Sequence, residues 1–204
     1  RAACSQGVIA TGRHRSMSQR STPTRRLFLR RSASLLLAGA SLPLASRVQA
    51  NLPATRDLAM DHTHTGESIA LTYAVDNSYL PEALSSLNHF LRDHYSGNIG
   101  NIDPRLFELL FRIRQTLDAR QAFQVISGYR CPATNIALQN SRGGGVASRS
   151  LHMEGKAIDV RLPGIALIDL RDVALSLGGG GVGFYPREQF VHIDTGRVRQ
   201  WAQS

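Results

Sequence analysis

The spacing of apolar residues after residue 66 predicts short strands interspersed with helices. Apolar residues at every second position are typical of strands, and apolar residues three or four apart are typical of helices. On this basis we expect strands over 69–75, 123–126, 157–162, 182–185 and 190–194. We expect one helix from Pro81 that stops before Gly97, and others over 104–117, 132–140 and 165–177.

The predicted strands and helices do not alternate regularly, so a doubly wound parallel sheet does not fit. We expect an α+β fold in which helices flank a small antiparallel sheet. Residues 51–66 are polar with little apolar pattern, and we interpret them as an extended segment that leads into the domain. Residues 67–204 then form one domain, which suits a chain of this length. Residues 141–150 contain three consecutive glycines and are expected to form a loop.

Charge is distributed unevenly along the chain, and this changes the interpretation of the net charge of +9. Residues 1–50 contain nine Arg and no acidic residue, whereas residues 51–204 contain 15 basic and 15 acidic residues. Without its first 50 residues the chain is therefore formally neutral, which argues against nucleic acid as a partner.

The basic segment 1–50 has the parts of an export signal. Residues 24–30, Thr-Arg-Arg-Leu-Phe-Leu-Arg, form a twin-arginine signature, and an apolar run over 32–44 follows. That run is too short and too interrupted for a membrane span. We expect the twin-arginine export machinery to deliver the chain to the periplasm or cell envelope, with cleavage after Ala50. Residue 1 is Arg, so we expect Met17 to be the true start.

Three side chains in the second half of the sequence have the chemistry of a catalytic zinc site. His152 and Asp159 are separated by Gly155, which permits a turn, and His192 follows on a predicted strand. A carboxylate flanked by apolar residues is costly to bury without a cation. Two neutral imidazoles and one carboxylate suit zinc and leave a coordination position for water. Strand alternation puts Asp194 on the same face as His192.

Taken singly, these residues have simpler interpretations. A lone His on a strand is commonly a hydrogen-bonded residue of the core or surface, and an Asp there commonly pairs with an Arg. His62 and His64 form a second His-x-His pair with strand spacing, which fits either a metal site or a polar turn. Spacing alone does not decide between these alternatives.

Three motifs in a fixed order give evidence beyond the spacing of single residues. They are Ser127–Gly128–Tyr129–Arg130, then Ser150–Leu151–His152 with Gly155, Ala157 and Asp159, and then Phe190–Val191–His192–Ile193–Asp194. Together they resemble peptidase family M15, the zinc D-Ala-D-Ala carboxypeptidases and murein endopeptidases, and within it the exported YcbK-like branch. The resemblance covers nearly all of the chain after the leader.

This resemblance implies a D-Ala-D-Ala carboxypeptidase/hedgehog-like fold and one zinc ion per chain. The implied ligands are His152, Asp159 and His192. It also implies that Arg130 acts on the substrate, where a fixed guanidinium can hold a carboxylate or polarise the scissile carbonyl. Ser150 is expected to hydrogen-bond a ligand or the substrate.

The identity of the proton acceptor stays open at this point. Many relatives carry Glu or Asp two or three residues before the last zinc histidine, where this chain has Phe190 and Gln189. The available acids are Glu188, Asp194 and Glu154. We favour Asp194 as the catalytic acid–base residue, with the orientation of a metal ligand as its alternative role.

The resulting hypothesis is a zinc metallopeptidase of the cell envelope that hydrolyses peptidoglycan cross-links or stem peptides with metal-activated water. Peptidoglycan is the expected partner, and the chain is expected to be a monomer. Two alternatives stay open: a non-catalytic zinc-containing protein that binds peptidoglycan, and a structural envelope protein without a metal. The sequence does not distinguish an endopeptidase from a carboxypeptidase.

Overall fold

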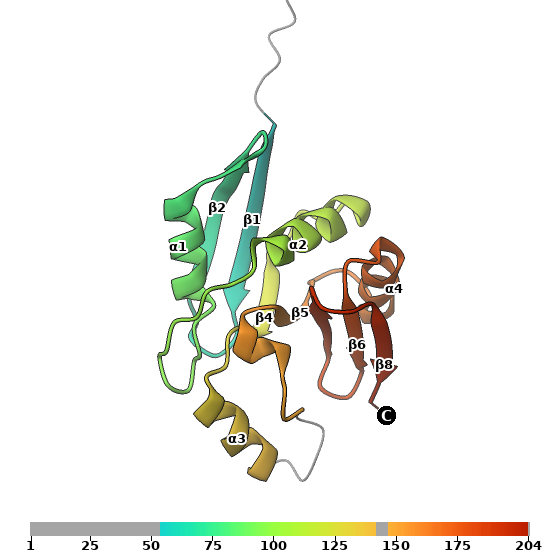
Figure 1. Ribbon diagram of the computed structural model, residues 1–204. Helices are drawn as coiled ribbons and strands as arrows, with labels where there is room; N and C mark the ends of the chain where they lie inside the picture. Colours follow the sequence, from blue (N-terminus) through green and yellow to red (C-terminus); the bar gives the residue numbers. More distant parts are fainter. Residues whose placement is uncertain (1–53, 142–146, 204) are drawn as a thin grey trace, which may run out of the picture. The chain divides into compact units, whose positions relative to one another are not determined.

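The structure is a computed structural model that describes residues 54–141 and 147–203 (Figure 1). The predicted export signal at 1–50, including Met17 and the cleavage site, and the glycine run at 143–145 lie outside the described residues. Within the described ranges the chain forms one mixed sheet and four α-helices. None of these helices combines the length and the apolar character needed to span a membrane.

The sheet has eight strands in the order β3-β2-β1-β4-β5-β7-β6-β8. The pairs β1–β4 and β6–β8 are parallel, and all other neighbouring strands of the described chain are antiparallel. The strands are β1 (Thr55–His62), β2 (Ser68–Val75), β3 (Ser78–Tyr79), β4 (Phe123–Ser127), β5 (Ala157–Arg161), β6 (Gly181–Tyr185), β7 (Phe190–Asp194) and β8 (Arg199–Ala202).

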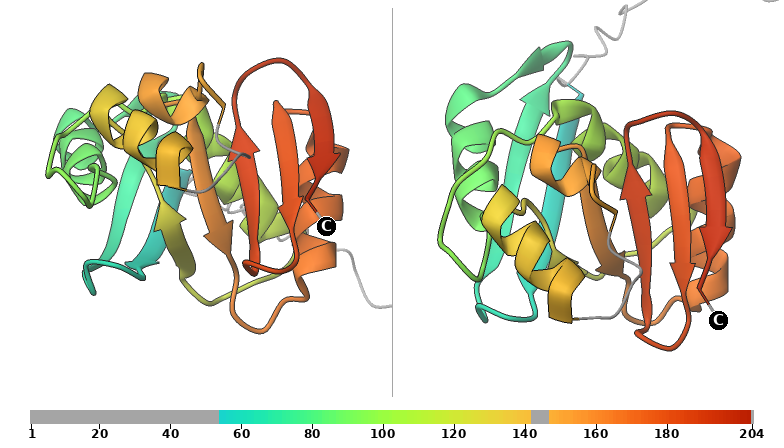
Figure 2. Two further views of the ribbon diagram at one scale, coloured as in Figure 1. Left: turned by 90° about the horizontal axis from the view of Figure 1, so that it is seen from below. Right: turned by 60° about the horizontal axis from the view of Figure 1, so that its bottom comes forward.

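The helices divide between core formation and site formation. The α-helices are α1 (Pro81–Phe90), α2 (Pro104–Thr116), α3 (Pro132–Ser141) and α4 (Leu167–Leu177), and a 3₁₀ helix, η1, spans Leu151–Glu154. Helix α2 packs against β1 and α4, and α4 packs against β6 and β7. In the right-hand view of Figure 2, α3 and η1 lie in front of the sheet and α4 lies behind it.

The two faces of the central strands differ in chemistry. Ile158 and Val160 of β5 and Val191 and Ile193 of β7 are fully buried in the core cluster, together with the apolar residues of α2 and α4. Because side chains alternate along a strand, the residues between them point to the opposite face. That opposite face is the one that α3 and η1 approach.

Most of the predicted elements are confirmed to within a few residues. Helix α2 begins at Pro104, and the Asp103 side chain accepts a hydrogen bond from the backbone N–H of Arg105 at 3.0 Å, as expected of an N-cap. Strand β7 has its predicted bounds. Helix α1 is shorter than expected, since it ends at Phe90, well before Gly97.

The predicted α+β class is confirmed, but the expectation of a small antiparallel sheet is wrong. The sheet has eight strands and two parallel pairs. Residues 51–66 were expected to be an extended segment leading into the domain, but Thr55–His62 forms β1, which lies inside the sheet between β2 and β4. Its inward residues, Leu58 and Met60, alternate with charged or small ones, so its mean composition is polar although one face is buried. The sheet therefore begins before residue 67.

Because β1 is an interior strand, truncation of its core residues is expected to be costly. Met60 is fully buried, and we expect Met60→Ala to lower the free energy of unfolding by about 2–5 kcal/mol. Ile136→Ala is the control, since Ile136 on α3 is 56% exposed. Urea unfolding followed by circular dichroism measures both, and equal stability of the two variants would contradict an interior position for β1.

Candidate metal centre

One row of paired positions crosses five strands and carries most of the site. Residues directly opposite one another in neighbouring strands point to the same face. Ser127 of β4 pairs with Asp159 of β5, which pairs with His192 of β7. His192 also pairs with Gly183 of β6, which in turn pairs with Trp201 of β8. We refer to these five residues as the site row.

His152 reaches the site row from η1, which lies over β5. The 3₁₀ helix ends at Gly155 in a left-handed conformation (φ 66°), and a Cβ at that position would lie 1.9 Å from the carbonyl oxygen of Asn101. Glycine is therefore required for this turn, as its conformation and its close contact both show. The His152 Nδ1 donates to the carbonyl oxygen of Gly128 at 2.7 Å, and the ring is buried.

The three predicted ligands converge. His192 Nδ1 lies 2.8 Å from Asp159 Oδ1 and 3.2 Å from His152 Nε2. His152 Nε2 lies 3.3 Å from the same Asp159 oxygen. One donor atom from each of the three lies within 4.8 Å of the others, and all three residues are buried. Among the described residues, no other group of three metal-binding side chains lies close enough together to hold a metal ion.

The charges of the three groups are strongly coupled. Burial opposes ionisation of Asp159, but the charges and hydrogen bonds of His152 and His192 outweigh it and hold the pKa of this carboxyl well below its usual value. Burial lowers the pKa of His152. Burial also acts on His192, but its hydrogen bonds to Asp159 and Asp194 outweigh that effect and raise its pKa. Asp159 is therefore an ionised carboxylate in a buried position.

The partners on the far side of each ring fit a metal-ligand role. The Gly128 carbonyl assigns the proton of neutral His152 to Nδ1, so Nε2 presents its lone pair to the cluster. The Asp194 carboxylate accepts from Nε2 of His192 at 3.1 Å, so Nδ1 is the nitrogen that faces Asp159. Such partners are typical of metal-bound histidines. The donor set can therefore hold a metal ion, in competition with a proton on His192 Nδ1.

Arg130 lies directly on the ligand cluster. It follows β4 by three residues, and its Nε donates to the Ser127 hydroxyl at 2.8 Å. Its Nη2 donates to Asp159 Oδ2 and lies 3.1 Å from His152 Nε2. The structure thus brings together the residue expected to contact the substrate and two of the three predicted ligands.

Asp194 lies on the face expected for it, but on the outer side of the His192 ring. Its carboxylate is fully buried and accepts from both terminal nitrogens of Arg199, at 3.1 and 2.8 Å. The backbone N–H groups of Gly181 and Gly196 donate to the same carboxylate, each at 2.9 Å. Although burial opposes it, these hydrogen bonds hold the pKa of Asp194 far below its usual value. This environment suits an orienting residue better than a proton acceptor.

The ligand cluster lies in a cleft with a volume of about 760 Å³. Its lining includes Arg130 and Ser150, both predicted site residues, and Ser150 makes no side-chain capping bond to η1. Two carboxylates line the cleft, those of Asp159 and Glu188. Glu154, the third candidate acid, is exposed, pairs with Lys156 at 2.8 Å and does not line the cleft.

The wall beside His192 holds residues that the motifs did not single out. The ring centroid of Trp201 lies 5.2 Å from that of His192, and its indole Nε1 donates to the Tyr185 hydroxyl at 2.9 Å. Gly183 makes room for the indole, because a Cβ there would lie within 2.6 Å of the Trp201 ring. A glycine inside a strand is a sign of such a close approach. Gly183 was therefore the feature of the sequence that could have pointed to this contact.

Comparison with known proteins decides the family. Residues 50–201 match the family model described as peptidoglycan L,D-endopeptidase MepK. The chain belongs to this family of M15 peptidases. The resemblance inferred from its three motifs is thereby confirmed.

Curated relatives of this family member carry the same description. Peptidoglycan L,D-endopeptidase MepK of Escherichia coli strain K12 is 45% identical over 165 residues, which cover 81% of this chain and 90% of the relative. The protein of the same name from Shigella flexneri matches equally well. Probable peptidoglycan L,D-endopeptidase MepK of Haemophilus influenzae is 37% identical over 161 residues, or 78% of this chain and 86% of the relative. No solved structure gave a significant match.

The other histidines that the structure of this MepK family member describes do not form a comparable metal site. His64 and His94 stack with 4.3 Å between ring centroids and 1° between their planes, and His62 lies 5.4 Å from His94, edge-on. His62 is buried, and its Nδ1 accepts from the backbone N–H of His64 at 3.2 Å. Among the described residues, no group of three metal-binding side chains includes any of them.

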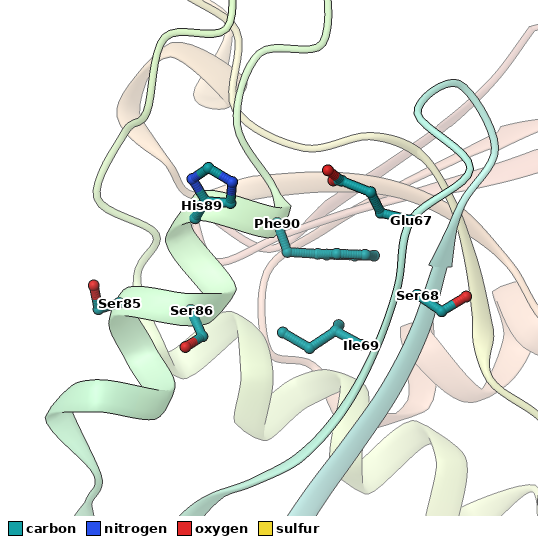
Figure 3. A pocket seen from close by; sticks show the side chains of 7 residues that line it. All are labelled: Glu67, Ser68, Ile69, Ser85, Ser86, His89 and Phe90. Carbon is teal, nitrogen blue, oxygen red and sulfur yellow. The ribbon is translucent and has the colours of Figure 1, made fainter.

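A second hollow of about 540 Å³ lies between α1 and β2 (Figure 3). The side chains of Phe90 and Ile69 lie between the helix and the strand, and Glu67 lies beside the strand. Glu67 is paired with Arg92 at 2.8 Å. With one histidine and one paired carboxylate among its lining residues, this hollow lacks the ligand set of the cleft.

The contact between Gly183 and Trp201 can be tested by fluorescence, because Trp201 is the one tryptophan of the chain. In Gly183→Ala the added methyl group displaces the indole from His192, so we expect emission at longer wavelength and weaker metal binding. Val182→Ala, on the opposite face of β6, is the control and should keep the wild-type spectrum. Unchanged emission and metal content in Gly183→Ala would contradict the close contact.

Proposed function

We propose that this chain is an exported zinc peptidase that hydrolyses L,D peptide cross-links of peptidoglycan. The observation that carries the proposal is the convergence of His152, Asp159 and His192 in one cleft. The printed names of the relatives supply the substrate and the bond type, and they favour an endopeptidase over a carboxypeptidase. Family membership also supports the D-Ala-D-Ala carboxypeptidase/hedgehog-like fold as the assignment for the mixed sheet.

One zinc ion per chain is the proposed cofactor, held by His152 Nε2, Asp159 and His192 Nδ1. Two imidazoles and one carboxylate are a common catalytic zinc set, with a position left for water or substrate. Zinc in such a set supplies a Lewis acid and lowers the pKa of water to about 7. Asp194 and the Gly128 carbonyl orient the two imidazoles from behind.

Arg130 is the proposed contact for the scissile carbonyl or for a carboxylate of the stem peptide. Its guanidinium is fixed by Ser127 and Asp159, and its planar donor geometry matches a carboxylate or a carbonyl oxygen. A charge held in place before the substrate binds needs little reorganisation when negative charge develops on the carbonyl oxygen. Ser150, at the start of η1 in the same cleft, is proposed to hydrogen-bond the peptide.

Glu188 is the proposed proton acceptor, in place of Asp194. Glu188 lies on the β6–β7 hairpin and lines the cleft, and no described residue forms an ion pair with it. Asp194 is fully buried, neutralised by Arg199 and separated from the ligand atoms by the His192 ring. In this role Glu188 takes a proton from the attacking water and returns it to the amine of the cleaved peptide.

The cell envelope is the proposed location, since peptidoglycan lies there. Transport by the twin-arginine machinery through residues 1–50, cleavage after Ala50 and action as a monomer belong to the same proposal. A twin-arginine route suits a metal enzyme, because the chain can acquire its metal and fold before transport.

The metal role is tested by digestion of isolated peptidoglycan. Wild-type protein is expected to carry about one zinc and to release cleaved peptides in mass spectra, and a chelator should stop this. Loss of a group that only orients a metal ligand costs about 10- to 100-fold in affinity or activity. We therefore expect His152→Ala to lose zinc and at least about 100-fold in activity.

His89→Ala is the matched control for His152→Ala, because His89 lies on α1 outside the cleft. Full activity in His152→Ala would rule out the proposed mechanism. Binding of peptidoglycan with zinc present but without cleavage would favour the non-catalytic alternative. Peptide dimers joined by L,D bonds, compared with dimers joined by D,D bonds, test the bond type.

The proton acceptor is tested by three isosteric changes. We expect Glu188→Gln to keep its zinc and to lose about 10²- to 10⁴-fold in kcat, the usual contribution of general acid–base catalysis. Asp194→Asn should instead weaken zinc binding by about 10- to 100-fold. Glu154→Gln should match the wild type. Normal kcat in Glu188→Gln would exclude Glu188 from this role.

A further inference from the structure

The direction of the hydrogen bond between Trp201 and Tyr185 follows from the chemistry of the indole. The indole N–H of tryptophan can only donate a hydrogen bond. The Tyr185 oxygen, 2.9 Å from Trp201 Nε1, must therefore be the acceptor. This leaves the hydroxyl hydrogen of Tyr185 free to donate, and no described residue accepts it.

The position of Tyr185 directs that hydroxyl toward the cleft. Tyr185 lies two residues after Gly183, which pairs with His192, so it is on the same face of the sheet. Both Tyr185 and Trp201 line the cleft that contains the ligand cluster and Arg130. Trp201 itself lies against His192, 5.2 Å between centroids. The Trp201 indole therefore contacts both the Tyr185 hydroxyl, by a hydrogen bond, and the ring of His192, a proposed metal ligand.

The ring of Tyr185 is held at one face and at its hydroxyl. It stacks on Phe190, its pairing partner in β7, with 4.5 Å between centroids and 17° between planes. The Trp201 indole that binds its hydroxyl is in turn covered by the Arg199 guanidinium at 4.8 Å, and Arg199 pairs with Asp194. The network that orients His192 therefore also fixes Tyr185.

The hydroxyl also keeps its hydrogen over a wide pH range. Burial, followed by the negative charges of Asp159 and Glu188, raises the pKa of Tyr185 above its ordinary value, although the Trp201 hydrogen bond opposes the shift. The raised pKa favours the neutral phenol, and a neutral phenol is a hydrogen-bond donor.

We propose that the Tyr185 hydroxyl donates a hydrogen bond to the carbonyl oxygen of the scissile peptide bond and stabilises the negative charge that develops there. This rests on the proposed peptidase function and adds a catalytic residue to it. Arg130 and Tyr185 then approach the carbonyl from different elements, the β4–α3 turn and β6. Trp201 is the positioning residue that selects which way the hydroxyl points.

The test is Tyr185→Phe, which removes one oxygen and keeps the ring and its stacking. Loss of one donor to a developing oxyanion costs about 10²- to 10³-fold in kcat. We expect a fall of this size in the cleavage of a purified L,D cross-linked peptide dimer, with KM within about twofold of wild type. Zinc content and the free energy of unfolding should stay normal, which shows that the ligand cluster and the fold are intact.

Tyr79→Phe is the matched control, since Tyr79 lies on β3 at the edge of the sheet and does not line the cleft. Unchanged kcat in Tyr185→Phe would overturn the proposal, and so would a rise in KM at constant kcat, which indicates ground-state binding alone. A wild-type protein that cleaves nothing is a different result, because it would overturn the proposed function and this inference with it.

Discussion

The buried contact between the Asp159 carboxylate and its cationic and imidazole neighbours is the interaction on which the rest of the site depends. An ionised carboxylate that is 4% exposed is costly unless hydrogen bonds and positive charge compensate it. Arg130, His152 and His192 provide this compensation from three elements, the β4–α3 turn, η1 and β7. These elements must all pack around β5 before the carboxylate can be buried.

Strand register connects this chemistry to stability. On β5 and β7 the residues next to the predicted ligands, such as Ile158 and Ile193, point to the other face and belong to the core with residues of α2 and α4. A slip of one residue would turn these apolar side chains to the cleft and the ligands into the core. The core therefore favours the same alignment of Asp159 with His192 that the site requires.

Side-chain chemistry and spacing singled out the candidate ligands, and the family resemblance made them the expected set, but neither predicted the arrangement around them. His152, Asp159 and His192 stood out because metal-binding residue types recur in short motifs. The face of Asp194 followed from alternation, whereas its place behind the His192 ring depends on Arg199 and on two backbone N–H groups. Strand β1 was missed because charged residues alternate with its buried ones. The role of Trp201 depends on pairing with a strand distant in sequence.

The position of β7 and β8 at the end of the described chain has a consequence for biosynthesis. His192 is the last of the three predicted ligands to leave the ribosome, and Arg199, which pairs with the Asp194 carboxylate behind it, follows seven residues later. A domain folds as a unit once its chain is available. The candidate metal-binding pocket is therefore incomplete in the nascent polypeptide until β7 and β8 have been synthesised, so a metal ion can be bound there only after that point.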